Sequence, residues 1–90
     1  MELFEIQYKK SIENDLKKVD KKYIPKILKL VESLATNPLQ SQSKKLKNTE
    51  NFYGIRVGQY RLIYQIQMRN HLIIIYYIRH RKHSYKSINF

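Results

Sequence analysis

Three consecutive segments rich in β-branched and aromatic residues limit the fold of this chain more than any other feature of its sequence. They are residues 52–57, 60–67 and 71–78. Gly58 and Gln59 suit a two-residue hairpin turn with glycine at its first central position. Arg69 and Asn70 suit a second tight turn. Strands joined by such short connections pair as neighbours, so we expect an antiparallel meander of three strands.

The residues before the meander favour a short strand and two helices. Alternation over residues 3–8 predicts the strand. Apolar residues then recur at helical spacing over residues 12–23 and again over residues 24–34, until Asn37 and Pro38 end the pattern. The polar stretch that follows, up to Asn51, has no periodicity and predicts a loop. The expected fold is α+β, in the order β-α-α-β-β-β, with an antiparallel sheet packed against an N-terminal helical hairpin.

Length and cysteine content narrow the class of protein. The chain has 90 residues. Protein domains usually contain about 100–200 residues, so the chain has no room for two domains and residues 1–90 are expected to form a single one. Cysteine is absent, which excludes disulfides, a thiol nucleophile and a zinc–thiolate site and favours a cytoplasmic location. The longest apolar run, residues 72–78, is far shorter than the roughly 20 residues of a membrane-spanning helix.

The charge is distributed unevenly along the chain. The net charge is +11, and no Asp or Glu follows Glu50. The basic residues after this point are Arg56, Arg61, Arg69, Arg79, Arg81, Lys82 and Lys86. Such a segment is expected to form a basic surface for a polyanion. The lysines of the amino-terminal half share their segments with carboxylates and predict a solvated helix surface.

The first hairpin brings two of these arginines together. A turn at Gly58 and Gln59 places Arg56 directly opposite Arg61 on one face of the sheet. Like charges in this position are destabilising, whereas two guanidinium groups suit a phosphate. Gly54 lies two residues earlier on the same face and leaves space beside them. The alternative is that an Asp or Glu from the helices neutralises the pair.

The basic segment after the last strand forms a second candidate group. A turn at residues 69–70 places Ile78 opposite Arg61 and points His80 to the face of the two arginines, although a slip of one residue would reverse this. Histidine can act as a general acid or base near pH 7. Arg81 can stabilise transition-state charge, and Tyr85 can stack on a base or transfer a proton.

A metal centre is not expected in this segment. His80 and His83 are close in sequence, but neither has a cysteine or carboxylate nearby. Metal sites in proteins normally need such additional ligands. We therefore expect no metal and no other cofactor.

Taken together, these residues resemble the RelE/ParE superfamily of bacterial toxins from type II toxin–antitoxin systems. The resemblance is carried by residues 54–64, residues 78–82, Tyr85 and the Lys-Lys-Leu sequence at 44–46. The basic carboxyl-terminal residues place it closer to the RelE branch. It implies a RelE-like fold, a cognate antitoxin as partner, and ribosome-dependent cleavage of mRNA in the A site by metal-free attack of the 2′-hydroxyl.

The resemblance also assigns candidate site residues. The catalytic candidates are Arg56, Arg61, Arg81, Tyr85, His80 and His83. The candidate RNA-binding residues are Lys44, Lys45, Lys47, Lys82 and Lys86. Gly54 departs from the pattern, because some RelE toxins carry a catalytic lysine there, and no glutamate of this half can serve as base. The base is therefore open among His80, His83 and Tyr85, with Lys45 or Lys47 as alternatives.

Two other functions fit the same sequence. A ParE-like toxin poisons DNA gyrase by binding and needs no nuclease residues. A plain nucleic-acid-binding module would bind in a salt-dependent manner and cleave nothing. Loss of toxicity in Arg81→Ala, with the fold and antitoxin binding retained, would favour the nuclease.

Overall fold

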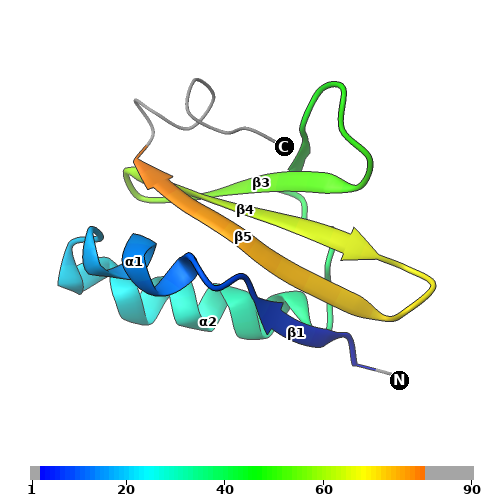
Figure 1. The fold of residues 1–90 in the computed structure, drawn as a ribbon, viewed down its shortest axis with the longest axis horizontal. Helices are drawn as coiled ribbons and strands as arrows, with labels where there is room; N and C mark the ends of the chain where they lie inside the picture. Colours follow the sequence, from blue (N-terminus) through cyan, green and yellow to red (C-terminus); the bar gives the residue numbers. More distant parts are fainter. Residues whose placement is uncertain (1–2, 81–90) are drawn as a thin grey trace.

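The computed structural model describes residues 3–80, which form a sheet with helices on one face (Figure 1). The elements are β1 (Glu5–Tyr8), α1 (Ile12–Lys17), the 3-10 helix η1 (Lys21–Tyr23), α2 (Ile24–Leu34), β2 (Lys44–Lys45), β3 (Phe52–Val57), β4 (Tyr60–Gln67) and β5 (Leu72–His80). The sheet has the strand order β1-β5-β4-β3-β2. The observed architecture is therefore α+β, as expected.

The sheet is mixed, which corrects the expectation of an antiparallel sheet. β1 pairs in parallel with β5, from Glu5 opposite Leu72 to Tyr8 opposite Ile75, whereas the other neighbouring strands are antiparallel. The strand pattern at residues 3–8 carries no information about its partner. Its direction is set by the helical crossover that carries the chain to the opposite edge of the sheet.

The central meander agrees with the sequence pattern. β3 and β4 have the expected bounds, and β5 begins one residue later and ends two residues later than expected. Gly58 has a φ of +60° in the turn, and a Cβ there would lie 2.3 Å from Cε1 of Tyr23. Both the positive φ and this close approach require glycine.

The helical region is more broken than expected. α1 ends at Lys17, and the Asp20 carboxylate then accepts a hydrogen bond from the Lys22 N–H at 3.2 Å and caps η1. α2 has Pro25 in its first turn and ends at Leu34, where the predicted apolar pattern also ends. Within residues 3–80, no helix is long and apolar enough to cross a membrane.

The core lies between α2 and one face of the sheet. Ile27, Val31 and Leu34 recur on one side of α2 and are buried. From the sheet, the buried residues of the same cluster are Ile55, Leu62, Tyr64, Ile66, Ile73, Ile75 and Ile78. No helix of residues 3–80 covers the opposite face of the central strands (Figure 1). This second face, which carries Arg56 and Arg61, is called the open face below.

β2 corrects the expectation of a loop across residues 39–51. Lys44 pairs with Gly54, and Lys45 pairs with Tyr53, at the edge of the sheet. Both lysines are exposed. A two-residue edge strand buries neither of its faces, so its sequence lacks the apolar alternation that would identify it, and charged side chains are typical of such edges.

Candidate functional site

A row of three arginines crosses the open face near one end of the sheet. Arg56 of β3 lies opposite Arg61 of β4, as the hairpin predicted, and Arg61 also lies opposite Arg79 of β5. Directly opposite residues share a face. The three guanidinium groups therefore belong to neighbouring strands on one surface.

A β-bulge in β5 produces the second pairing. Tyr64 lies opposite Ile75, but Ile63 lies opposite Tyr77, so Tyr76 is the extra residue. Ile75 and Ile78 are three positions apart, so in a regular strand their side chains would point to opposite faces of the sheet. Because of the bulge, both point into the core.

The same bulge corrects two expectations. Arg79, not Ile78, lies opposite Arg61, and His80 lies opposite Tyr60. His80 thus belongs to the helix-covered side rather than the arginine face. Its Nε2 is 3.3 Å from Oε1 of Gln59, and its ring meets that of Tyr60 edge-on at 5.6 Å.

A carboxylate from the helices does reach the arginine row, but at Arg79. Asp15 of α1 is buried, and its Oδ1 accepts a hydrogen bond from Arg79 Nη1 at 2.7 Å. Its Oδ2 accepts a hydrogen bond from the Ile78 N–H at 3.1 Å. The Arg79 guanidinium also lies over the Tyr77 ring, 4.6 Å from its centroid. Asp15 therefore fixes both the end of β5 and the side chain of Arg79.

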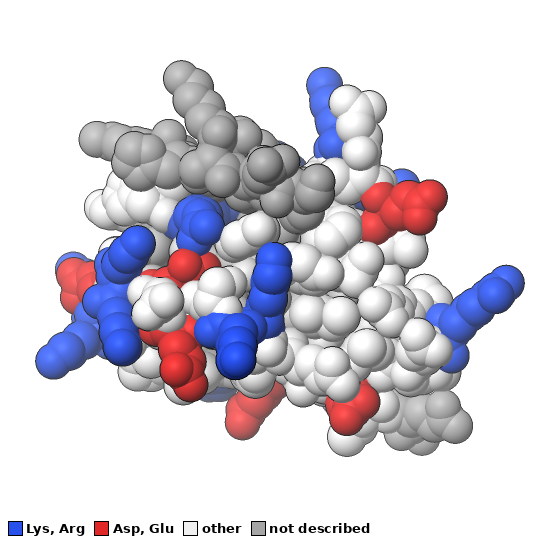
Figure 2. All heavy atoms as spheres, viewed as in Figure 1, with Lys and Arg blue, Asp and Glu red and all other residues white. Residues whose placement is uncertain are grey.

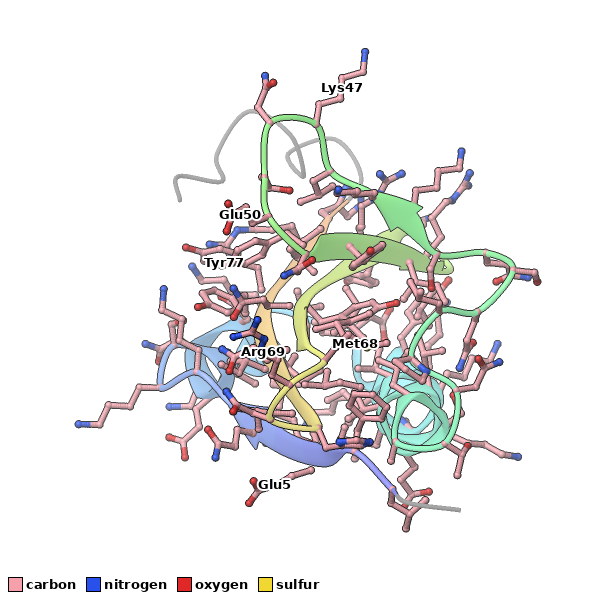
Figure 3. All side chains as sticks on the ribbon, turned by 90° about the vertical axis from the view of Figure 1, so that its right-hand side faces the viewer. Glu5, Lys47, Glu50, Met68, Arg69 and Tyr77 are labelled. Carbon is pink, nitrogen blue, oxygen red and sulfur yellow. The ribbon has the colours of Figure 1, made fainter. Side chains whose placement is uncertain are left out.

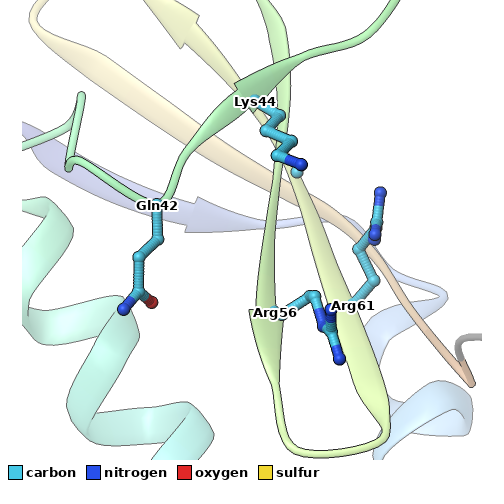
Figure 4. Close-up of a pocket in the computed structure, with 5 residues that line it drawn as sticks. Gln42, Lys44, Arg56 and Arg61 are labelled. Atoms are coloured by element: carbon cyan, nitrogen blue, oxygen red, sulfur yellow. The ribbon is translucent and has the colours of Figure 1, made fainter.

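The other end of the row lines a pocket of about 360 Å³ (Figure 4). The lining residues are Gln42, Lys44, Gly54, Arg56 and Arg61. The close-up shows Lys44 reaching from β2 toward the β3–β4 pair, whereas Gln42 points toward α2. Among residues 3–80, the lining includes three cationic side chains and no acidic one. An anion is the ligand that such a pocket favours.

Gly54 shapes the floor of this pocket. A Cβ at this position would lie 3.2 Å from Cδ1 of Ile63 and 3.3 Å from Cδ of Arg61. The aliphatic stem of Arg61 therefore lies against the strand where a side chain would otherwise stand. The space that the sequence predicted beside the arginines is partly filled by Arg61 itself.

The candidate lysines are separated by the structure. Lys44 lines the pocket, whereas Lys45 is the next residue of the strand, opposite Tyr53, and faces the other side of the sheet. Lys47 points outward from the loop between β2 and β3 (Figure 3). Of these three lysines, only Lys44 contributes to the pocket.

A buried hydroxyl holds the segment that leads to Lys44. The Tyr64 hydroxyl donates to the Pro38 carbonyl oxygen at 2.8 Å and lies 2.7 Å from Ser43 Oγ. Ser43 Oγ also accepts from the Gln40 N–H at 3.2 Å. Burial raises the pKa of Tyr64 above its ordinary value of 10.0, and the hydrogen bond with Ser43 offsets part of this effect. The residue before Lys44 is thus tied to the core.

Sequence reasoning missed Asp15, Gln42 and Tyr64 as contributors to this region. A signal for Asp15 existed: it lies three residues after Ile12 and four before Val19, on the apolar face of the helix. A carboxylate in that position needs a buried partner. Gln42 and the Tyr64 hydroxyl carried no comparable signal.

The remaining site candidates belong to the carboxyl-terminal segment of the sequence. Arg81, Lys82, His83, Tyr85 and Lys86 lie outside the described residues. Within residues 3–80, no group of three or more His, Cys, Asp or Glu side chains could hold a metal ion.

The charge on the helical side of the molecule differs from that of the pocket. Figure 2 shows Lys and Arg side chains interleaved with Asp and Glu around α1, at the left of the view. Mixed charges of this kind agree with the solvated helix surface that the sequence predicted.

Comparison with known sequences identifies the family. Residues 6–85 match the family described as the ParE toxin of the type II toxin–antitoxin system parDE. RelE1 of Methanocaldococcus jannaschii is 31% identical over 87 residues, which cover 93% of this chain and 97% of the relative. Toxin RelE3 of the same organism is 35% identical over 85 residues, covering 89% of this chain and 93% of the relative.

Solved structures agree with this assignment. A chain of the RelB–RelE antitoxin–toxin complex from Methanococcus jannaschii has a TM-score of 0.76 and 26% identity, covering 92% of this chain and 99% of that chain. A chain of the archaeal RelE–RelB complex from Pyrococcus horikoshii has the same fold, with a TM-score of 0.78 and 23% identity. The match covers 88% of this chain and 96% of that chain. The resemblance seen in the sequence is confirmed: the chain belongs to the ParE toxin family of the RelE/ParE superfamily and is a RelE-like toxin of a type II toxin–antitoxin system.

Proposed function

We propose that residues 1–90 form a single toxin domain that cleaves mRNA on the ribosome, in the A site, without a metal ion. The observation that carries the proposal is the pocket lined by Lys44, Arg56 and Arg61. A cationic pocket without acidic lining residues suits the phosphate of an RNA backbone. The relatives named RelE support a nuclease of this class.

The proposed reaction is an internal transfer of the phosphate. The 2′-hydroxyl oxygen attacks the adjacent phosphorus and loses its proton to a base, while the bond from phosphorus to the 5′-oxygen breaks. The leaving 5′-oxygen takes up a proton, and the products are a 2′,3′-cyclic phosphate and a 5′-hydroxyl. Arg56 and Arg61 stabilise the charge that develops on the phosphate oxygens.

The proton-transfer groups of this reaction are proposed from the sequence. Arg81 and Tyr85 follow β5 in the chain and are the proposed third arginine and the aromatic that orients the nucleotide. The base is sought among His80, His83 and Tyr85. Because His80 lies on the helix-covered side of the sheet, His83 and Tyr85 are the first to be tested.

The proposed regulatory partner is a cognate antitoxin. Solved relatives with this fold are complexes of RelE with RelB. An antitoxin with acidic residues would neutralise the basic open face and suppress RNA binding. The proposed place of action is the cytoplasm, where the ribosomes are.

The test is primer extension on a defined mRNA, with and without translating ribosomes. We expect cuts at codon positions only when ribosomes are present. Arg61→Gln should slow cleavage about 100-fold or more, because one charge-stabilising donor of the pocket is lost. A 2′-deoxy substitution at the cut site should abolish cleavage. Normal cleavage by Arg61→Gln, or cleavage of the deoxy substrate, would contradict the proposal.

A second candidate function is inhibition of DNA gyrase, as expected of a ParE-like toxin. The match of residues 6–85 to the ParE toxin family favours it. A supercoiling assay with purified gyrase separates the two functions. Inhibition of supercoiling with no RNA cleavage on ribosomes would replace the nuclease by this alternative.

A further inference from the structure

We infer that Lys44 is a third phosphate-binding residue of the pocket, presented to the RNA from the edge strand β2. This inference rests on the proposed function, since it takes the ligand of the pocket to be an RNA phosphate. It assigns one role to Lys44 and a different one to its neighbour Lys45. The sequence alone placed both in a single group of RNA-binding lysines.

The register of the sheet places Lys44 on the same face as Arg56 and Arg61. Lys44 lies opposite Gly54, and Gly54 lies opposite Ile63. Arg56 and Arg61 form the next row of the same face. Because Gly54 has no side chain, nothing from β3 stands between Lys44 and the two arginines. All three cationic side chains border the same pocket.

The lysine ammonium and the two guanidinium groups can bind different oxygens of one phosphate. The guanidinium groups of Arg56 and Arg61 donate hydrogen bonds in a fixed plane, whereas a lysine ammonium is a compact charge with three donors. A phosphate held between them has oxygens left for a donor from another direction. Lys44 comes from a different strand and can bind such an oxygen without competing for the positions of the arginines.

Ser43, the residue before Lys44, is held by hydrogen bonds. An exposed lysine on a free loop would pay a large entropic cost to hold one position. Here Ser43 is bonded to the buried Tyr64 hydroxyl at 2.7 Å and to the Gln40 N–H at 3.2 Å. The Lys44 backbone is therefore held on both sides, by this network and by its pairing with β3.

Lys45 provides a matched control. Lys44→Gln and Lys45→Gln remove the same charge from adjacent residues of one exposed strand. Long-range electrostatics would weaken RNA binding equally in the two variants. Direct contact with the phosphate predicts a loss in Lys44→Gln alone, beyond the small effect shared by both.

The experiment measures binding of a short single-stranded RNA by fluorescence anisotropy at fixed salt. The RNA carries a 2′-deoxy residue so that it is not cleaved, and circular dichroism checks the fold of each variant. We expect Lys44→Gln to bind at least tenfold more weakly than the wild type and Lys45→Gln no more than about twofold more weakly. Lys44→Arg should restore binding to within about threefold of the wild type, because the positive charge is kept.

The outcomes separate this inference from the proposed function. Equal losses in Lys44→Gln and Lys45→Gln, with Arg61→Gln binding much more weakly, would overturn the role of Lys44 alone. Failure of the wild type to bind the RNA would overturn the role of Lys44, and combined with no cleavage on ribosomes it would overturn the nuclease as well. Selective loss in Lys44→Gln, combined with no cleavage on ribosomes, would support the phosphate site and overturn the nuclease.

Discussion

The two ends of the arginine row differ although the same kind of side chain forms both. At one end, Arg79 is bound by the buried Asp15 and lies over the Tyr77 ring. At the other end, Arg56 is exposed and borders a pocket with no acidic residue in the described part of its lining. Arg61 lies between them, opposite both. One end of the row is neutralised within the fold, and the other end borders a cationic pocket.

This difference shows that a basic residue on a cationic face is not necessarily available to a ligand. The Asp15 carboxylate neutralises Arg79, and its hydrogen bonds to Arg79 and to the Ile78 N–H join α1 to β5. The described lining of the pocket holds Lys44, Arg56 and Arg61 and no acidic residue, so this end of the row suits an anion. The comparison predicts that substitutions at the two ends will separate activity from stability.

The largest expected effect is on RNA cleavage by Arg56→Gln. We expect a decrease of about 100-fold in the cleavage rate, because a donor to the developing phosphate charge is lost. Stability should stay within about 0.5 kcal/mol of the wild type or rise slightly, since a like-charge contact is removed. Primer extension and urea unfolding measure the two quantities. A loss of stability as large as the loss of activity would remove the distinction between the ends.

The next effect is on stability at the opposite end of the row. Asp15→Ala should lower the free energy of unfolding by about 2–4 kcal/mol, because it leaves the Ile78 N–H and the Arg79 guanidinium without their acceptor. Urea unfolding measures the loss. Glu13→Ala, on the exposed side of the same short helix, is the control and should change stability by less than about 0.5 kcal/mol. Equal effects of the two variants would argue against a special role for Asp15.

A smaller effect is expected where the core supports the pocket. Tyr64→Phe should lower stability by about 1–2 kcal/mol, because the Pro38 carbonyl and Ser43 lose a buried partner. RNA binding should weaken a few-fold, since Ser43 precedes Lys44. Tyr8→Phe is the control, because Tyr8 is 52% exposed. Unchanged RNA binding in Tyr64→Phe would mean that the network does not position Lys44.

The pH dependence of stability gives the smallest and most specific test. Burial raises the pKa of Tyr64 in the folded protein above its ordinary value of 10.0, so the fold favours the neutral phenol. The associated stabilisation is fully present below pH 10 and is lost as the pH rises through the folded pKa. Unfolding measured across this range should show a decline that is shallower in Tyr64→Phe. Identical slopes in both proteins would contradict the assignment.

Much of this arrangement was predictable from local sequence. The β-rich segments and the Gly58 turn gave the bounds of β3 and β4 and placed Arg56 opposite Arg61. A two-residue turn fixes the register of the strands it joins, and register decides which side chains share a face. The family resemblance followed from the same residues.

Other parts could not be read from the sequence, because they depend on contacts between distant segments. A regular β5 would have put Ile78 opposite Arg61. Instead, β5 contains a bulge that lets both Ile75 and Ile78 face the core, and Arg79 lies opposite Arg61. A two-residue edge strand leaves no hydrophobic pattern, so the pairing of Lys44 with Gly54 was hidden within an apparent loop.

The sequence by itself determined the kinds of secondary structure, the first hairpin and its facing arginines, because turn geometry and side-chain periodicity act over a few residues. The tertiary structure decided which arginine is neutralised and which lysine faces the pocket. Asp15 and Ile78 are 63 positions apart in the chain, and their contact exists only once the helix has packed against the completed sheet. The division between a structural end and an open end of the arginine row is therefore a property of the packed fold.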